Sequence, residues 1–215
     1  MVARATKRHT WSSQMQVAVI GVGNVGSVLA RKLSEAGHTV FVAATSAERA
    51  RQAAEEVDCL PADSAAEAAR RAEAVILAIP ADEHANVAEE IGPAVAGKPV
   101  IDVSNGPLAV QQGTSLAEAL QQHLPQAPVV KAFNTAFASR MADPVQDGKP
   151  LDGFLAGDDP GAKQKVATLV RDVGFEPLDA GELNMARTLE GMAWMNISLN
   201  MANGWPWQSG WRLER

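Results

Sequence analysis

Apolar runs alternate with stripes of apolar residues at helical spacing along most of the chain. The run from Gln16 to Ile20 predicts a strand. The residues after it repeat an apolar side chain every three or four positions, which predicts a helix: Val25, Val28, Leu29, Leu33 and Ala36. Gly37-His38 ends this helix before a second apolar run, Thr39 to Ala44. The pattern predicts a βαβ unit at the start of an α/β fold.

The same alternation continues to about residue 135. The predicted elements are a helix over 47–57, a short strand at 59–60, a helix over 64–72, a strand over 74–79, a short helix containing 87–91, a strand over 100–103, a helix over 115–123 and a strand over 129–133. The strands over 74–79 and 100–103 are continuous apolar runs, which is typical of a parallel sheet covered by helices on both faces. We therefore expect a Rossmann-type, doubly wound, mainly parallel sheet.

The remaining residues predict a small C-terminal α/β extension. Its expected elements are strands over 153–156 and 175–178, a helix over 161–173 and a long last helix over 182–201. We expect a loose N-terminal extension over 1–14, a dinucleotide-binding domain over 15–140, and an extension over 141–215 that completes an acceptor pocket and a dimer interface.

The last helix is expected to be apolar nearly all round. Beside one apolar stripe it carries further large apolar side chains at Met185, Met192, Trp194, Met195 and Leu199. Such a helix is either a core helix or, as we favour, a homodimer interface or the wall of a flat-ligand pocket. Trp205, Trp207 and Trp211 follow it and are expected to fold back over a pocket or a partner subunit.

A glycine-rich loop, Gly21-Val22-Gly23-Asn24-Val25-Gly26, joins the first strand to the first helix. In the dinucleotide-binding fingerprint, the first glycine permits a tight turn, the second lets a pyrophosphate approach the backbone, and the third lets helix and strand pack closely. The helix N-terminus then offers N–H groups to an anion. The alternative is a purely structural glycine turn.

The residues after the second predicted strand favour NADP over NAD. An acidic residue that would bind the ribose 2′-hydroxyl of NAD is missing from this place. Thr45 and Ser46 offer hydroxyl groups, and Arg49 offers a positive charge, to a 2′-phosphate. The alternative is that a hydroxyl residue caps the next helix and that Arg49 is a solvated surface charge.

Composition excludes several other functions. The net charge of -6 and the sequence pI near 5.2 give no reason to expect nucleic acid or an anionic membrane as a partner. Cys59 is the only cysteine, and no apolar run approaches the ~18 residues that span a bilayer, so we expect a cytoplasmic protein. The four histidines have no metal-ligand spacing, and no Ser/His/Asp or Cys/His set predicts a catalytic side chain.

Several short motifs together resemble a known family. They are the glycine loop, Ala78-Ile79-Pro80 with His84-Ala85, Ile101-Asp102-Val103-Ser104-Asn105, Val130-Lys131-Ala132-Phe133-Asn134, Ala156-Gly157-Asp158-Asp159 and Pro177-Leu178-Asp179-Ala180-Gly181. In this order they resemble the deazaflavin-dependent NADP reductases (NADPH:coenzyme F420 oxidoreductases) and the related reductase domain of the six-transmembrane metalloreductases.

The resemblance implies hydride transfer between NADPH and a flavin-like ring stacked on the nicotinamide, with no side chain acting as acid or base. The residues that it assigns to the cofactor are, for the pyrophosphate, Gly23, Asn24 and Val25; for the 2′-phosphate, Thr45, Ser46 and Arg49; and for the nicotinamide, Ile79, Pro80, Asn134, Thr135 and Ala136. His84 is a further candidate for a polar contact with the cofactor, or else a surface histidine at the start of a helix.

The chain also departs from these relatives. Ala44-Thr45 replaces their Ser-Arg pair, and the segment Trp205-Pro206-Trp207 is richer in aromatic residues than their tail. With Trp205 and Trp207 lining the acceptor pocket, the acceptor is expected to be a deazaflavin, a flavin or another flat molecule. The rival functions are an imine or carbonyl reductase of the pyrroline-5-carboxylate reductase or hydroxyacid dehydrogenase type, and a non-catalytic NADP(H)-sensing module.

Overall fold

The structure, a computed structural model, describes residues 14–106 and 113–215. The loose N-terminal extension expected over 1–14 therefore lies outside the described residues, apart from Gln14. Within the described ranges no helix is long and apolar enough to cross a membrane.

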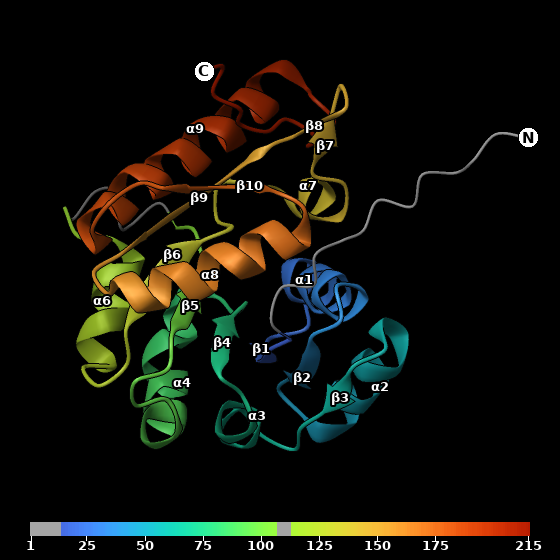
Figure 1. Ribbon diagram of the computed structural model, residues 1–215, viewed down its shortest axis with the longest axis vertical. Coiled ribbons are helices and arrows are strands. Elements are labelled where there is room, and N and C mark those ends of the chain that lie inside the picture. Colours follow the sequence, from blue (N-terminus) through green and yellow to red (C-terminus); the bar gives the residue numbers. More distant parts are fainter. Residues whose placement is uncertain (1–13, 107–112) are drawn as a thin grey trace, which may run out of the picture.

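One eight-stranded sheet forms the centre of the molecule, with the strand order β10-β9-β6-β5-β4-β1-β2-β3 (Figure 1). Its strands are β1 (Gln16–Ile20), β2 (Thr39–Ala43), β3 (Leu60–Pro61), β4 (Ala74–Leu77), β5 (Val100–Asp102), β6 (Val129–Ala132), β9 (Asp152–Gly157) and β10 (Glu176–Asp179). The first six strands pair in parallel in the order 3-2-1-4-5-6 of a doubly wound dinucleotide-binding sheet. The predicted Rossmann-type, mainly parallel sheet is confirmed.

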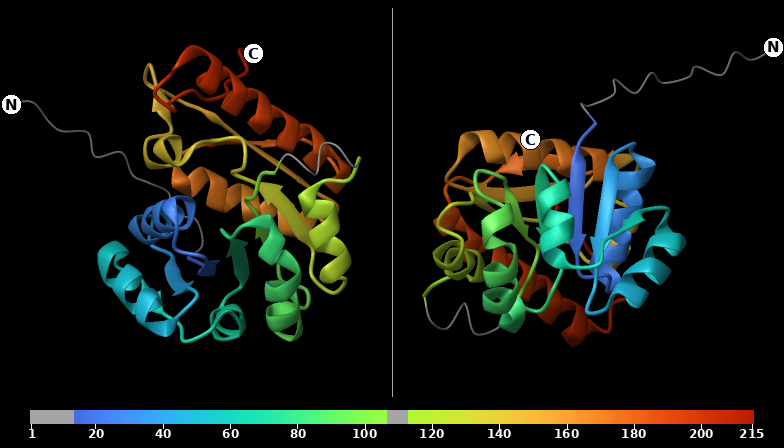
Figure 2. Two further views of the ribbon diagram at one scale, coloured as in Figure 1. Left: turned by 180° about the vertical axis from the view of Figure 1, so that it is seen from behind. Right: turned by 90° about the horizontal axis from the view of Figure 1, so that it is seen from below.

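Helices cover both faces of the sheet, so each face has its own apolar core (Figure 2). On one face lie α1 (Asn24–Glu35), α2 (Ala47–Val57), α7 (Ala138–Ala142) and α8 (Pro160–Val173). On the other lie α3 (Ala65–Arg71), α4 (His84–Ile91) and α6 (Leu116–His123). Short 3-10 turns are η1 (Ala81–Glu83), η2 (Gly92–Ala94) and η3 (Leu183–Met185). Burial on both sides explains why the central strands are apolar throughout.

The C-terminal residues extend this same sheet. Strand β9 pairs antiparallel with β6, Val130 opposite Gly157, and β10 runs parallel to β9. A small hairpin of β7 (Val145–Gln146) and β8 (Lys149–Pro150) precedes β9. Neither the hairpin nor α7 was predicted.

The last helix, α9 (Ala186–Asn203), differs from the prediction. Its buried positions include the polar residues Glu190, Asn196 and Asn200, whereas Trp194 is 47% exposed. The expected long apolar helix, buried on several sides, is therefore not confirmed. The apolar pattern alone predicts inward-facing apolar residues, but polar side chains fill much of the buried stripe because they have polar partners there, as Asn200 has in Ser209.

The parallel strands bring their carboxyl ends to one edge of the sheet. Ile20 lies opposite Leu77 where β1 and β4 are neighbours, and the chain order reverses between these two strands. In open α/β sheets, ligands bind in the crevice outside the carboxyl ends of the strands at such a point. The candidate site must therefore be sought in the loops that follow β1, β2, β4, β5 and β6.

Candidate functional site

The three glycines of the loop after β1 have different surroundings. A Cβ on Gly21, whose φ is +98°, would lie 2.2 Å from the carbonyl oxygen of Ala78, and one on Gly26 would lie 1.9 Å from that of Gly21. A Cβ on Gly23 would meet no heavy atom within 4 Å. Packing within the described residues thus requires glycine at 21 and 26, while Gly23 leaves open space in front of its backbone.

Gly23 is also the N-cap residue of α1 and, having no side chain, makes no capping hydrogen bond there. Gly23 and Asn24 are exposed, and Val25 is partly buried. An exposed helix N-terminus beside a bare backbone suits a phosphate group, because its N–H groups and the helix dipole both favour an anion. The loop therefore has the form that the fingerprint requires for a pyrophosphate.

Thr45, Ser46 and Arg49 lie beside this loop, at the end of the neighbouring strand β2, and all three are exposed. Ser46 caps α2, since its Oγ accepts a hydrogen bond from the Arg49 backbone N–H at 3.2 Å. The capping alternative is confirmed, but it leaves the Arg49 side chain uncommitted: no ion pair within the described part of the chain involves its guanidinium.

The residues expected around the nicotinamide lie at the ends of β4 and β6. Ile79 is partly buried and Pro80 exposed, while Asn134, Thr135 and His84 are buried. His84 begins α4 and is only 5% exposed, so the alternative of a surface histidine is wrong.

The backbone is strained at Phe133, which leads into the segment Asn134 to Ala136 after β6. Phe133 is a buried non-glycine residue at φ +62°, in the left-handed region that L residues seldom adopt. The turn after it is closed by a hydrogen bond from the Ala136 N–H to the Phe133 carbonyl oxygen, at 3.1 Å. Such strain persists where the surroundings fix the backbone, and it is concentrated at functional sites.

Asn134 is held by a reciprocal pair of hydrogen bonds with Asn105, which follows β5. The Asn105 side-chain amide donates to the Asn134 carbonyl oxygen at 2.8 Å, and the Asn134 amide donates to Asn105 Oδ1 at 2.9 Å. The loops after β5 and β6 are therefore fixed to one another.

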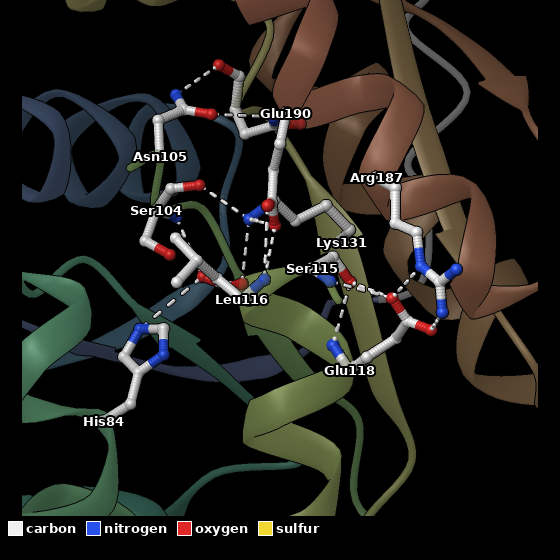
Figure 3. A network of polar contacts seen from close by, with 11 residues as sticks. His84, Ser104, Asn105, Ser115, Leu116, Glu118, Lys131, Arg187 and Glu190 are labelled. Carbon is white, nitrogen blue, oxygen red and sulfur yellow. Dashed lines mark hydrogen bonds and ion pairs between the residues drawn. The ribbon is translucent and has the colours of Figure 1, made fainter. Parts of the chain in front are cut away.

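A buried charge cluster, which sequence reasoning missed, lies behind these loops (Figure 3). It consists of Asp102 on β5, Lys131 on β6 and Glu190 on α9. Lys131 Nζ is 2.9 Å from Asp102 Oδ2 and 2.8 Å from Glu190 Oε1, and all three side chains are at most 1% exposed. The signal in the sequence was a charged residue inside each of three apolar segments.

The protonation of the cluster follows from burial and charge. Burial alone would raise the pKa of Asp102, but the charges of Lys131 and His84 and hydrogen bonds from Ser104 and Lys131 outweigh it and lower that pKa. Burial is the main cause that raises the pKa of Glu190, and the charge of Lys131 opposes it. Burial also lowers the pKa of His84, even though its Nε2 is 3.7 Å from Asp102 Oδ1. The arrangement favours an ionised Asp102 beside Lys131.

Buried polar atoms without a hydrogen-bond partner gather at this edge of the sheet. Within residues 14–106 and 113–215 they include His84 Nε2, Ser104 Oγ and Asn134 Oδ1. An unsatisfied buried polar group costs about 1–3 kcal/mol, so a set of three calls for a polar ligand. The carboxamide and ribose hydroxyls of a nicotinamide nucleotide offer both donors and acceptors, so these residues fit the nicotinamide half of NADP(H).

The two tryptophans expected in the acceptor pocket lie on the C-terminal tail. Trp205 and Trp207 are each 44% exposed. The Trp207 ring meets the Phe137 ring edge to face, with centroids 5.4 Å apart, and the Ser139 hydroxyl donates to the Trp207 carbonyl oxygen at 2.5 Å. The tail thus rests on the start of α7, one residue beyond Ala136.

The described residues contain no group of three or more His, Cys, Asp or Glu side chains that could hold a metal ion. The fold and the site together define a Rossmann-type, nucleotide-binding oxidoreductase. Residues 16–106 match the family described as coenzyme F420-dependent NADP oxidoreductase.

Several solved structures resemble most of the chain. A protein of Arthrobacter sp. FB24, provisionally assigned as an F420-dependent NADP reductase, is 28% identical with a TM-score of 0.82, over 94% of this chain and 100% of that one. A hypothetical protein of Sinorhizobium meliloti is 30% identical with a TM-score of 0.70, over 80% and 87% of the two chains.

Other likenesses concern one segment or the fold alone. Rat metalloreductase STEAP3 is 38% identical over 100 residues, which are 46% of this chain and 20% of that protein. The matched segment is thus about a fifth of this curated relative. An imine reductase of Pseudomonas sp. is 22% identical with a TM-score of 0.70, over 89% of this chain and 64% of that one, and shares the fold alone.

Proposed function

We propose that the protein transfers a hydride between NADP(H) and a flat, flavin-like acceptor, a deazaflavin or a flavin, stacked on the nicotinamide. The observation that carries the proposal is the group of buried polar atoms at His84, Ser104 and Asn134 that have no hydrogen-bond partner among the described residues. They lie at the carboxyl edge of the sheet where a nicotinamide belongs. The family match and the assigned activity of the Arthrobacter relative support the same function.

The chain's own residues bind and orient the two rings. When bound, the nicotinamide supplies the hydride, and the acceptor takes up the hydride together with a proton from solvent. Direct transfer depends chiefly on proximity and orientation, so backbone and small polar side chains can suffice. Ile79 and Pro80 border one side of the nicotinamide position, and Asn134, Thr135 and Ala136 border the other.

The acceptor is proposed to bind against the C-terminal tail. The contact between Trp207 and Phe137 supports this position, because it brings an aromatic surface to the segment that follows Ala136. Thr45, Ser46 and Arg49 are proposed to select NADP by contacts with the 2′-phosphate, since they lie beside the glycine loop and Arg49 carries a positive charge.

Anaerobic mixing tests the function. NADPH or NADH is mixed with the protein and with deazaflavin, FMN, FAD, riboflavin or ferric chelates, and nicotinamide absorbance is followed. We expect NADPH to be consumed only with a flavin-like acceptor, and faster than NADH. NADPH binding without turnover of any acceptor would support a sensing module instead. Turnover of a cyclic imine or a carbonyl compound alone would support the imine or carbonyl reductase alternative.

A further inference from the structure

The buried charge cluster of Asp102, Lys131 and Glu190 joins the two ends of the segment between β5 and α6. Lys131 Nζ donates a hydrogen bond to the Ser104 carbonyl oxygen at 2.6 Å. The Glu190 carboxylate accepts from the Leu116 N–H at 3.0 Å and 3.2 Å. Because Lys131 and Glu190 are themselves paired at 2.8 Å, one ion pair holds both Ser104 and Leu116.

The cluster fixes the Ser104 backbone at both of its polar groups. The Ser104 N–H donates to Asp102 Oδ1 at 2.8 Å. The Ser104 carbonyl oxygen accepts from Lys131, and Figure 3 draws this bond. The next residue, Asn105, is bonded in turn to Asn134. Ser104 Oγ and Asn134 Oδ1, two of the buried atoms without a hydrogen-bond partner in the described residues, therefore belong to residues that the cluster positions directly or through one neighbour.

Stability alone does not account for such a cluster. Taking charges out of water costs several kcal/mol per ion, and well-packed apolar residues in the same place are often as stable or more so. Buried ionic groups are better explained where they fix one specific arrangement. Here the arrangement that they fix is the loop edge that faces the nicotinamide position.

We propose that Lys131 is a positioning residue for the nicotinamide half of the cofactor. It acts through the Ser104 carbonyl and through Glu190 on α9. It thereby holds Ser104 and, through Asn105, Asn134 where Ser104 Oγ and Asn134 Oδ1 meet the carboxamide and the ribose. The pyrophosphate and the adenosine half are bound by other loops, after β1 and β2, and do not depend on it. This inference rests on the proposed function.

Calorimetry with two ligands tests the proposal. NADPH carries both halves of the cofactor, whereas 2′-phospho-ADP-ribose lacks the nicotinamide. In Lys131→Met we expect NADPH affinity to fall about tenfold or more, a loss of roughly 1.4 kcal/mol. The affinity for 2′-phospho-ADP-ribose should stay within about twofold of the unchanged protein, because the glycine loop is unaltered. A merely structural role would lower both affinities together.

A milder variant keeps the test informative if Lys131→Met does not fold. Glu190→Gln removes the ion pair but retains an oxygen that can accept from the Leu116 N–H. We expect a smaller loss, again confined to NADPH. Lys163→Met is the matched control, because Lys163 pairs with Asp179 on β10, outside the site, and should leave both affinities unchanged.

The outcomes separate this inference from the function on which it rests. Equal losses for both ligands, or no loss for NADPH in either variant, would overturn the role of Lys131 while leaving NADPH binding by the unchanged protein intact. Failure of the unchanged protein to bind NADPH would overturn the proposed function itself.

Discussion

At the scale of single residues, two glycines of the loop after β1 are required by packing, and the third is not. Gly21 and Gly26 have backbone atoms close to where a Cβ would stand, so each is required by the fold. Gly23 has only open space there and a φ of -76°, which any residue can adopt. Its lack of a side chain matters only if something else approaches its backbone.

We therefore expect Gly23→Ala to weaken NADPH binding at least tenfold, roughly 1.4 kcal/mol, without lowering the melting temperature. Calorimetry and thermal unfolding measure the two effects. Gly92→Ala is the control, because its Cβ would also meet no atom closer than 4.0 Å, at the end of α4. Unchanged NADPH affinity in Gly23→Ala would contradict the assignment of this loop to the pyrophosphate.

The sequence predicted the glycine loop because the loop is local: strand, turn and helix follow within a few residues. It did not predict the buried charge cluster. Asp102 and Lys131 are 29 positions apart, and only the pairing of β5 with β6 brings them opposite one another. A lone charge in an apolar segment shows that a partner is needed, but it does not show which residue that partner is.

At the scale of elements, α6 and α9 are joined by Glu118. The Glu118 side chain accepts from the Ser115 N–H and hydroxyl, which completes a capping box at the start of α6. It also accepts two hydrogen bonds from the Arg187 guanidinium on α9. The bond from Arg187 is the main reason why the pKa of Glu118 is lowered to about 2.

This pKa shift predicts a pH-dependent contribution to stability. A carboxyl group with a pKa of about 2 when folded and 4.5 when unfolded stabilises the fold above pH 4.5, and the contribution is lost as the pH falls towards 2. The difference in melting temperature between the unchanged protein and Glu118→Gln should therefore be largest above pH 4.5 and shrink below it. Glu55→Gln, at an exposed position on α2, should show no such trend. A difference that does not vary between pH 2 and 6 would rule out this role.

The accuracy with which the sequence predicts an element depends on the length and the periodicity of that element. The first six strands of the sheet follow from apolar runs and lie within a few residues of the predicted bounds. The hairpin β7–β8 has only two residues in each strand, too few for a period to be recognised. The antiparallel direction of β9 depends on where the chain re-enters the sheet, and a local pattern of residues cannot predict that position.

At the scale of the whole molecule, α9 exposes a set of large apolar side chains. Its residues Trp194, Met195, Leu199 and Met201 are between 41% and 68% exposed. Because exposed apolar patches often mark contacts with another protein, we expect this face to form a homodimer. Light scattering should give twice the chain mass for the unchanged protein and the single mass for Leu199→Asp.

Leu60→Asp is the matched control for this change. Leu60 is 45% exposed and lies on β3, at the opposite edge of the sheet from β9 and β10. Its substitution should leave the assembly unchanged. A monomeric unchanged protein would contradict the expected dimer.

The buried charge cluster also restricts how this chain can change over evolutionary time. Loss of Lys131 alone leaves two carboxylates without a counter-charge, and loss of either carboxylate alone alters the balance that remains. Single substitutions at these positions therefore pass through an unfavourable intermediate sequence. Positions 102, 131 and 190 are expected to be inherited as a set, so that relatives without the lysine have also lost at least one of the two acids.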